Sequence, residues 1–325
     1  MAAATVLPAP ASAKGHTEIT RPPALRPGDL VVVPSPAGPT DAAAVEKGVA
    51  LLESWGLEVE LTPHALGRDG YLSGTDEERT ADLEYAFSHP DAKAVIATRG
   101  GYGSTRILDR VDYTGLRDKP KLVAGYSDIT ALHAAVHARA GLATLHSPMV
   151  AWADGNTDAT AEALKNALMT ADPVRLERDD AEPTADVLVP GRAEGRLLGG
   201  NLSLLAAEIG SRNFPDLDGA ILFLEDVGEE RYRVDGLLTS LIRSGHLDGV
   251  AGFAIGQFLP AWGDEPGEGE WTMADVITDR LAGYGVPILG GLKLGHGDDP
   301  RVAPLGTEAE MDAETGVLTV ESALR

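Results

Sequence analysis

From Gly28 to about residue 146 the sequence alternates between short β-rich runs and longer amphipathic stretches. This alternation predicts a parallel β-sheet covered by helices. One short crossover between successive strands indicates a flavodoxin-like or Rossmann-like sheet, whose sites lie at the carboxyl ends of its strands. Strands are expected at 29–34, 57–61, 94–98, 121–125 and 142–146, and helices at 40–55, 75–88, 104–111 and 128–140.

Two domains are expected. The flavodoxin-like domain spans residues 28–170 and ends with a helix at 158–170. In 171–190 acidic residues and three prolines replace the periodic pattern, which indicates a linker. Residues 191–325 are predicted to form an α+β domain. Its strands are expected at 192–198, 219–224, 250–256, 286–290, 302–305, 308–312 and 317–320, and its helices at 201–208, 231–244 and 272–283.

The first 27 residues are predicted to form a disordered tail. Ala11-Ser12-Ala13 resembles the small-residue cleavage site of a signal peptide. However, no Lys or Arg precedes the short apolar stretch, and Pro8 and Pro10 interrupt it. The sequence therefore favours a tail over a secretion signal.

The charge of the chain limits its partners. Its 325 residues include 27 Lys and Arg against 50 Asp and Glu, a formal net charge of −23. Nucleic acids and anionic membranes are bound mainly through Lys and Arg, so neither is expected as a partner. No apolar run approaches the roughly 20 residues of a membrane-spanning helix. The absence of cysteine excludes disulfides, thiolate metal sites and a cysteine nucleophile.

A serine lies on the predicted turn between the strand 121–125 and the helix that follows. Such a turn exposes the hydroxyl of Ser127 and directs the backbone N–H of Asp128 toward a developing oxyanion. The alternative is a simple helix cap, since Ser and Asp are both preferred at that position. The usual nucleophile turn reads Gly-x-Ser-x-Gly, and here Ile129 takes the last place. This motif alone leaves both interpretations open.

A glycine-rich segment, Arg99-Gly-Gly-Tyr-Gly-Ser104, follows the preceding strand. As a dinucleotide fingerprint it is incomplete, because Arg106 replaces the third glycine. A second interpretation gives the backbone N–H of Gly101 to the oxyanion, beside that of Asp128. The third is an ordinary tight turn. Adjacent parallel strands would place this segment beside the loop that carries Ser127.

Histidine and carboxylate candidates lie farther along the chain. His133 and His137 have the i, i+4 spacing of a zinc helix, but no third ligand is suggested, so packing is favoured over metal binding. His296 lies between Gly295 and Gly297, in a loop free to face a cleft. Glu225 follows an apolar run, where a carboxylate is costly unless it caps a helix or meets a partner such as histidine.

Together these motifs resemble those of the LD-carboxypeptidases, in the serine peptidase family that also contains the microcin-immunity peptidases. The resemblance extends from Pro27 to Val320 and implies a flavodoxin-like amino-terminal domain plus a smaller α+β carboxyl-terminal domain with barrel-like β character. The motifs are Arg99-Gly-Gly-Tyr-Gly103, Pro120-Lys121 leading to Gly125-Tyr-Ser-Asp128, Gly199-Gly-Asn-Leu-Ser203, Phe223-Leu-Glu-Asp226 and Gly295-His296-Gly297.

The resemblance also implies roles for single residues. It makes Ser127 the nucleophile, His296 the general base and Glu225 the residue that orients the imidazole. It implies a cytoplasmic homodimer that needs no metal or other cofactor and cleaves the L-to-D bond of murein tetrapeptides. An arginine suits the carboxylate of the released D-alanine. The oxyanion donors would be Gly101 and Asp128, and the substrate-binding candidates are Arg99, Tyr102 and Arg106.

Two other functions stay open. Within the same family, a microcin-immunity-like peptidase would hydrolyse peptidyl or aminoacyl nucleotides, with Trp262 and Trp271 as stacking surfaces. The other open function is that of a non-catalytic binding module that closes on a sugar or peptide. One departure from the family pattern is His146-Ser147-Pro148, where His-Gly-Pro is usual. It alters a wall of the expected site and leaves the three candidate catalytic residues untouched.

Overall fold

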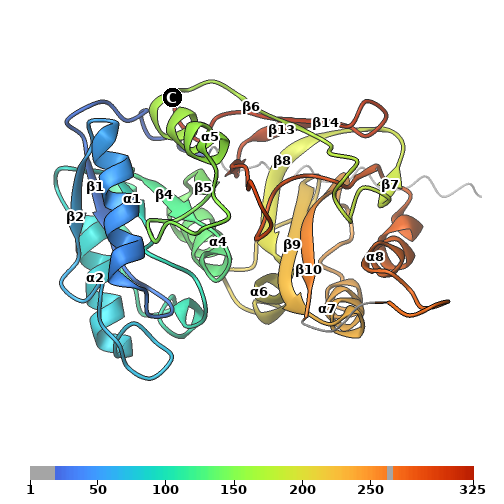
Figure 1. The fold of residues 1–325 in the computed structure, drawn as a ribbon, viewed down its shortest axis with the longest axis horizontal. Helices are drawn as coiled ribbons and strands as arrows, with labels where there is room; N and C mark the ends of the chain where they lie inside the picture. The colour runs from blue at the N-terminus through green and yellow to red at the C-terminus, as the bar shows by residue number, and fades with distance from the viewer. Residues whose placement is uncertain (1–18, 262–265) are drawn as a thin grey trace, which may run out of the picture.

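The computed structural model describes residues 19–261 and 266–325, which form two β-sheets with helices packed on them (Figure 1). The predicted α/β fold with two sheets is confirmed. None of the helices in these two described ranges is long and apolar enough to cross a membrane. Residues 1–18, most of the predicted tail, lie outside the described part of the chain.

The first sheet has the predicted flavodoxin-like order. Its five parallel strands run β5-β4-β3-β1-β2, and β12 joins β5 in antiparallel orientation. The chain order therefore reverses between β1 and β3, the kind of place where open α/β sheets bind ligands. The strands are β1 (Leu30–Val33), β2 (Glu58–Leu61), β3 (Ala92–Ile96), β4 (Leu122–Gly125), β5 (Thr144–His146) and β12 (Ala303–Leu305).

Helices cover both faces of this sheet because side chains on a strand alternate between faces. Val32 packs with residues of α2, α3 and α4 on one face. Its neighbours Val31 and Val33 pack with residues of α1 and α5 on the other face. The helices are α1 (Ala42–Ser54), α2 (Asp76–Ser88), α3 (Thr114–Asp118), α4 (Ile129–Ala140) and α5 (Asp158–Met169).

Most predicted helices form, and one does not. The helix expected at 104–111 is wrong beyond its first turn: only the 3-10 helix η1 (Ser104–Arg106) is present, and α3 was not expected. The backbone conformation of Gly103 and two hydrogen bonds to Asp128 keep this segment from continuing as an α-helix. Gly103 has φ +132°, and both the backbone N–H and the hydroxyl of Ser104 donate to Asp128.

The second sheet has eight strands in the order β6-β14-β13-β8-β9-β10-β11-β7. Strands β8 to β11 are parallel, and the others pair in antiparallel orientation. The expected barrel-like character takes the form of an open sheet whose edge strands, β6 and β7, follow each other in the chain. The strands are β6 (Val174–Glu177), β7 (Leu188–Val189), β8 (Arg192–Asn201), β9 (Ile221–Glu229), β10 (Gly252–Pro260), β11 (Ile288–Leu289), β13 (Glu308–Asp312) and β14 (Val317–Val320).

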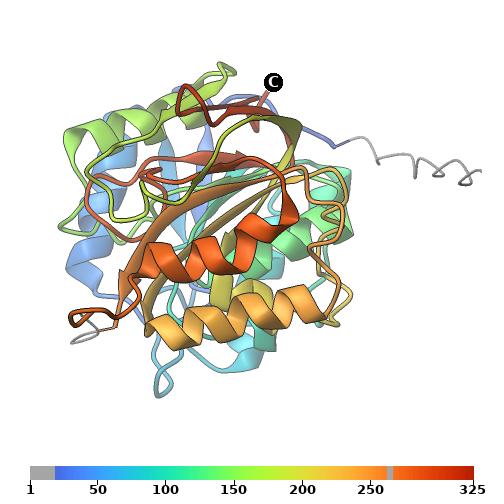
Figure 2. The same cartoon turned by 90° about the vertical axis from the view of Figure 1, so that its right-hand side faces the viewer.

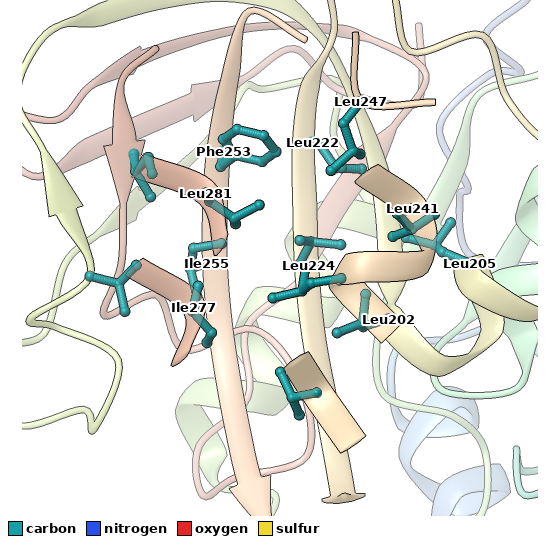
Figure 3. Packing of buried hydrophobic residues seen from close by; sticks show 14 of the residues in the cluster. Leu202, Leu205, Leu222, Leu224, Leu241, Leu247, Phe253, Ile255, Ile277 and Leu281 are labelled. Atoms are coloured by element: carbon teal, nitrogen blue, oxygen red, sulfur yellow. The ribbon is translucent and has the colours of Figure 1, made fainter. Parts of the chain in front are cut away.

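One face of the second sheet carries a core of leucine, isoleucine and phenylalanine (Figure 3). Leu222 and Leu224 of β9 point into it, whereas Ile221 and Phe223 join the core on the opposite face. Figure 2 views the side on which two helices lie across this sheet. The helices of this part are α6 (Leu202–Ala207), α7 (Arg231–Arg243), α8 (Met273–Leu281) and the 3-10 helix η2 (Ala282–Tyr284).

The two halves of the chain are more interwoven than the predicted boundaries suggest. The predicted linker 171–190 contains β6 and β7, both strands of the second sheet. At the other end, β12 completes the first sheet, and Leu324 packs in the core of the first sheet. The prediction of a disordered tail is wrong for residues 19–27, because Leu25 is buried in that same core.

Candidate active site

Ser127 lies on a tight turn between β4 and α4. Its φ is +64°, and the only other non-glycine residue with positive φ in the described ranges is Asp299. Left-handed backbone costs a residue with a Cβ roughly 1–2 kcal/mol, so the surrounding structure must hold it. A strained strand-to-helix turn of this kind lifts a side chain clear of the sheet edge. The structure therefore places Ser127 on the predicted turn, partly exposed to solvent.

The glycine-rich segment lies against this turn. Strands β3 and β4 are parallel neighbours, so their following loops meet at one edge. A Cβ added to Gly100 would lie 2.9 Å from the Cβ of Ser127 and 3.1 Å from its Oγ. Only glycine allows this approach without displacing the serine. The predicted neighbourhood of the two loops is confirmed.

Glu225 and His296 form a hydrogen-bonded pair. The Nδ1 of His296 is 2.7 Å from the Oε2 of Glu225, whose side chain is fully buried. Burial raises the pKa of Glu225, and the hydrogen bond to His296 opposes that rise. The sequence places Glu225 just after a strand, but β9 continues through it, because Asn201 of β8 pairs with it in the ladder.

Tyr126 connects this pair to the serine turn. Its ring centroid is 4.7 Å from that of His296, and Ser127 is the next residue in the chain. On its other side Tyr126 meets the ring of His146 at 5.8 Å. Burial raises the pKa of Tyr126 to about 12, so it stays a neutral packing surface. Residues from both sheets thus converge on the turn: serine from the first, glutamate and histidine from the second half of the chain.

Comparison with known proteins decides the family. The family model for the LD-carboxypeptidase N-terminal domain matches residues 31–147, and that for the LD-carboxypeptidase C-terminal domain matches residues 194–311. This chain belongs to the LD-carboxypeptidase family. A family of peptidases therefore accounts for both sheets and for all the site elements described above.

Relatives support the assignment over almost the full chain. A putative carboxypeptidase of Streptomyces coelicolor is 43% identical over 310 residues, which is 94% of this chain and 97% of the relative. A probable murein peptide carboxypeptidase of Bacillus subtilis is 36% identical over 308 residues, 93% of this chain and 94% of the relative. The structure of MccF in complex with glutamyl sulfamoyl guanosine superposes with a TM-score of 0.83 at 25% identity, covering 94% of this chain and 99% of that one.

In this LD-carboxypeptidase family member, Asp128 does not cap α4 with its side chain. Its Oδ2 instead accepts the backbone N–H of Ser104 at 2.9 Å, and its carbonyl accepts the Ser104 hydroxyl at 2.9 Å. The simple capping interpretation is therefore wrong. Within the described ranges, the backbone N–H groups of Gly101 and Asp128 donate no hydrogen bond to another backbone group.

Three histidines lie behind the serine turn or on the helix that follows it: His133, His137 and His146. The Nε2 of His133 is 2.9 Å from the carbonyl of Gly125, at the end of β4. Burial lowers the pKa of His133 and of His137 to about 4, and that of His146 far below its usual range. In residues 19–261 and 266–325 no group of three or more His, Asp or Glu side chains is placed to hold a metal ion. Of the i, i+4 pair, His133 is buried and His137 is partly buried.

The three substrate-binding candidates lie in different settings. Arg99 lines an open cleft of about 710 Å³ together with Tyr126. Arg106 is absent from its lining: its guanidinium binds both oxygens of Asp76, at 2.9 and 3.0 Å. Tyr102 is 52% exposed and packs edge-on against Tyr71, outside the cleft. Among these candidates, Arg99 is the one that lines this cleft.

Two further predicted features have mixed outcomes. Trp271 is 52% exposed, whereas Trp262 falls outside the described residues. Ser147, which replaces the usual glycine, is buried, and its backbone N–H donates to the carbonyl of Gly125. Its hydroxyl donates to the carbonyl of Pro148 at 3.0 Å. The substitution is therefore accommodated by a hydrogen bond within the wall behind the serine turn.

Sequence reasoning gave Asn201 no role, although its motif was noted. The Nδ2 of Asn201 donates to Asp226 at 2.9 Å, and its backbone N–H donates to Thr130 of α4 at 3.0 Å. Asn201 thus joins the strand that carries Glu225 to the helix that follows Ser127. Its position after two glycines and before a helix was the available signal.

Proposed function

We propose that this chain is a serine LD-carboxypeptidase that removes the terminal D-alanine of murein tetrapeptides through an acyl-enzyme. The observation that carries this proposal is the strained turn at Ser127, with the hydrogen-bonded His296 and Glu225 pair against the adjoining tyrosine. The Bacillus subtilis relative is named a probable murein peptide carboxypeptidase, which supports the substrate class.

In the proposed mechanism, Ser127 Oγ attacks the carbonyl carbon of the third residue, and Nε2 of His296 takes the serine proton. Glu225 accepts the Nδ1–H and so leaves Nε2 unprotonated to act as base. The N–H groups of Gly101 and Asp128 stabilise the negative oxygen that forms. The intermediate then releases D-alanine, whose nitrogen takes the proton from His296. Water hydrolyses the acyl-enzyme by the reverse proton path.

A second candidate is hydrolysis of aminoacyl or peptidyl nucleotides. It is favoured by the likeness to MccF, whose structure holds glutamyl sulfamoyl guanosine, and by the exposed indole of Trp271, which could stack on a base. A binding module without catalysis is the remoter alternative. It is disfavoured by the strain at Ser127, which simple ligand binding does not require.

The test is release of free D-alanine from an L-alanyl-D-glutamyl-diaminopimelyl-D-alanine tetrapeptide. We expect release by the wild-type protein in the presence of EDTA, and a loss of about 10³-fold or more in kcat in Ser127→Ala with binding retained. Hydrolysis of aminoacyl sulfamoyl adenosine alone would favour the nucleotide branch. Failure of the folded protein on both substrates would favour the binding module.

The resemblance also leads us to propose that the protein acts as a homodimer in the cytoplasm. Light scattering of the purified full chain should give twice the mass of 33.9 kDa. Cell fractionation should recover the protein with soluble cytoplasmic markers. A monomer, or recovery outside that fraction, would contradict the corresponding part.

A further inference from the structure

The cleft beside the serine turn lies at the carboxyl edge of the first sheet. Residues that follow each of the five parallel strands line it, so it spans the point where the strand order reverses. Its volume of about 710 Å³ is in the range of pockets that enclose a whole small ligand, and far exceeds the needs of a single alanine. The cleft therefore has room for more of the substrate than the leaving residue.

Three cations line this cleft in a strongly acidic protein: Lys47, Arg68 and Arg99. Within the described part of the chain, no carboxylate is within ion-pair distance of any of them. The cleft also contains two acids. Asp41 caps α1 by accepting the N–H of Ala44 at 3.1 Å, which leaves Asp154 as the acid without a structural task. The lining thus offers positive charge together with one available carboxylate.

The three cations follow different strands of the first sheet. Arg99 directly precedes Gly100, the residue that touches Ser127. Lys47 is on α1, after β1, and Arg68 follows β2. In the order β4-β3-β1-β2, strands spaced by about 4.8 Å put β1 roughly 10 Å and β2 roughly 14 Å from the strand that leads to Ser127. Arg99 thus follows the strand next to that of Ser127, and its Nη1 donates to the carbonyl of Pro39 at 3.0 Å, whereas Lys47 and Arg68 follow strands two and three places away from β4.

A diaminopimelyl tetrapeptide has one carboxylate close to the reacting bond and another at the end of the side chain of its third residue. The D-alanyl carboxylate is close to the scissile carbonyl and suits Arg99. The third residue supplies that carbonyl, so its side chain starts at the serine turn. A diaminopimelyl side chain ends in a carbon that bears a carboxylate and an ammonium, whereas a lysyl side chain ends in an ammonium alone. The distal charges of diaminopimelate match a cleft lined by two further cations and one available acid.

We propose that this cleft is the subsite for the third residue and selects diaminopimelyl over lysyl peptides, with Lys47 and Arg68 binding the distal carboxylate and Asp154 the distal ammonium. The inference rests on the proposed carboxypeptidase function and adds specificity-determining residues to it. A lysyl side chain could offer its ammonium to Asp154 but has no carboxylate for Lys47 and Arg68, and it brings a positive charge toward these two cations, which disfavours its binding.

The first experiment compares three tetrapeptides with the wild-type protein: diaminopimelyl, diaminopimelyl amidated at the distal carboxylate, and lysyl. The amide keeps the shape and removes one charge. We expect kcat/KM for D-alanine release to be at least about tenfold higher for the free acid than for either of the others. Equal values would overturn the inference and leave the carboxypeptidase established. No release from any peptide would instead remove the proposed function, and this inference with it.

The second experiment tests the residues. Lys47→Met and Arg68→Gln should each lower kcat/KM for the free-acid peptide by about tenfold, and leave the lysyl peptide unchanged or improved. Both side chains are exposed, so folding is expected to be kept, and circular dichroism checks this. The matched control is Lys165→Met, an exposed lysine on α5 that does not line the cleft. An equal loss on all three peptides, or an equal effect in the control, would contradict the assignment.

Discussion

At the scale of single residues, Glu225 combines a cost in stability with the orienting role that we propose for it. Its carboxyl is fully buried, and burial raises its pKa, so the charged form is disfavoured inside the fold. A carboxyl with a raised pKa loses its contribution to stability as the pH climbs through that raised value. A perturbed pKa beside a hydrogen-bonded histidine is typical of functional sites.

Glu225→Gln should therefore separate activity from stability. We expect kcat to fall by about 10²- to 10⁴-fold, because a neutral amide no longer fixes the proton on Nδ1 of His296 or stabilises the imidazolium. The free energy of unfolding in urea at pH 8 should equal or exceed that of the wild type, since glutamine does not ionise. The control is Glu208→Gln, a buried glutamate beside Ser211, which should keep its kcat. Unchanged kcat in Glu225→Gln would argue against the orienting role.

At the scale of elements, a histidine of α4 forms a hydrogen bond to the end of the strand that leads into the serine turn. His133 is buried, and its Nε2 lies 2.9 Å from the carbonyl of Gly125, the last residue of β4. The pKa of His133 is lowered to about 4, so the imidazole is neutral in the fold and donates this hydrogen bond. In the unfolded chain a histidine binds a proton near pH 6.5. The fold must therefore lose stability as the pH falls.

Between pH 7 and pH 4, His133 alone should cost the wild type on the order of 3 kcal/mol of unfolding free energy. The stability is present at neutral pH and is lost as the pH falls from the unfolded toward the folded pKa. Urea unfolding at several pH values measures it. His133→Gln keeps a donor for Gly125 without titrating, so its stability should fall less steeply with acid. Parallel pH profiles for the two proteins would contradict this account.

At the scale of the whole molecule, the candidate site depends on how the two sheets are joined. Thr130 of α4 accepts the backbone N–H of Asn201 from β8. Beside it, a Cβ on Gly200 would lie 2.6 Å from the Thr130 Oγ1, and Gly200 has φ +136°. This close approach aligns the element that carries Ser127 with the one that carries Glu225. The candidate site therefore depends on a close approach at Gly200, which pairs with Leu224, the residue before Glu225.

Gly200→Ala should push the two elements apart. We expect at least about a tenfold loss in kcat for D-alanine release, because a shift on the order of 1 Å misplaces serine relative to histidine, and destabilisation of about 1–3 kcal/mol from overpacking. Gly236→Ala on α7 is the control, since a Cβ there has open space within 4 Å and the φ is ordinary. That variant should match or exceed the wild type in stability. Equal kcat in both variants would show that the contact between Gly200 and Thr130 does not position the site residues.

Much of the fold could be predicted from local patterns. The strand bounds at 308–312 and 317–320 coincide with β13 and β14. The helix expected at 75–88 forms as α2, and a capping box of Thr75 and Glu78 begins it. These features depend on neighbours two to four residues apart. The expected helix at 104–111 failed because Asp128, distant in the chain, binds the backbone of Ser104. The strands in 171–190 were missed because their pairing partners come from the other end of the chain.

The same division applies to the site. The sequence by itself determined the strand-to-helix turn at Ser127 and the residue types of the candidate triad, because short motifs fix local backbone and chemistry. Only the tertiary structure decided that Arg106 is held by Asp76 and that Lys47, an ordinary exposed lysine on a helix, faces the cleft with Arg99. Charge partners and clefts come from contacts between segments far apart in the chain, and no local periodicity encodes them.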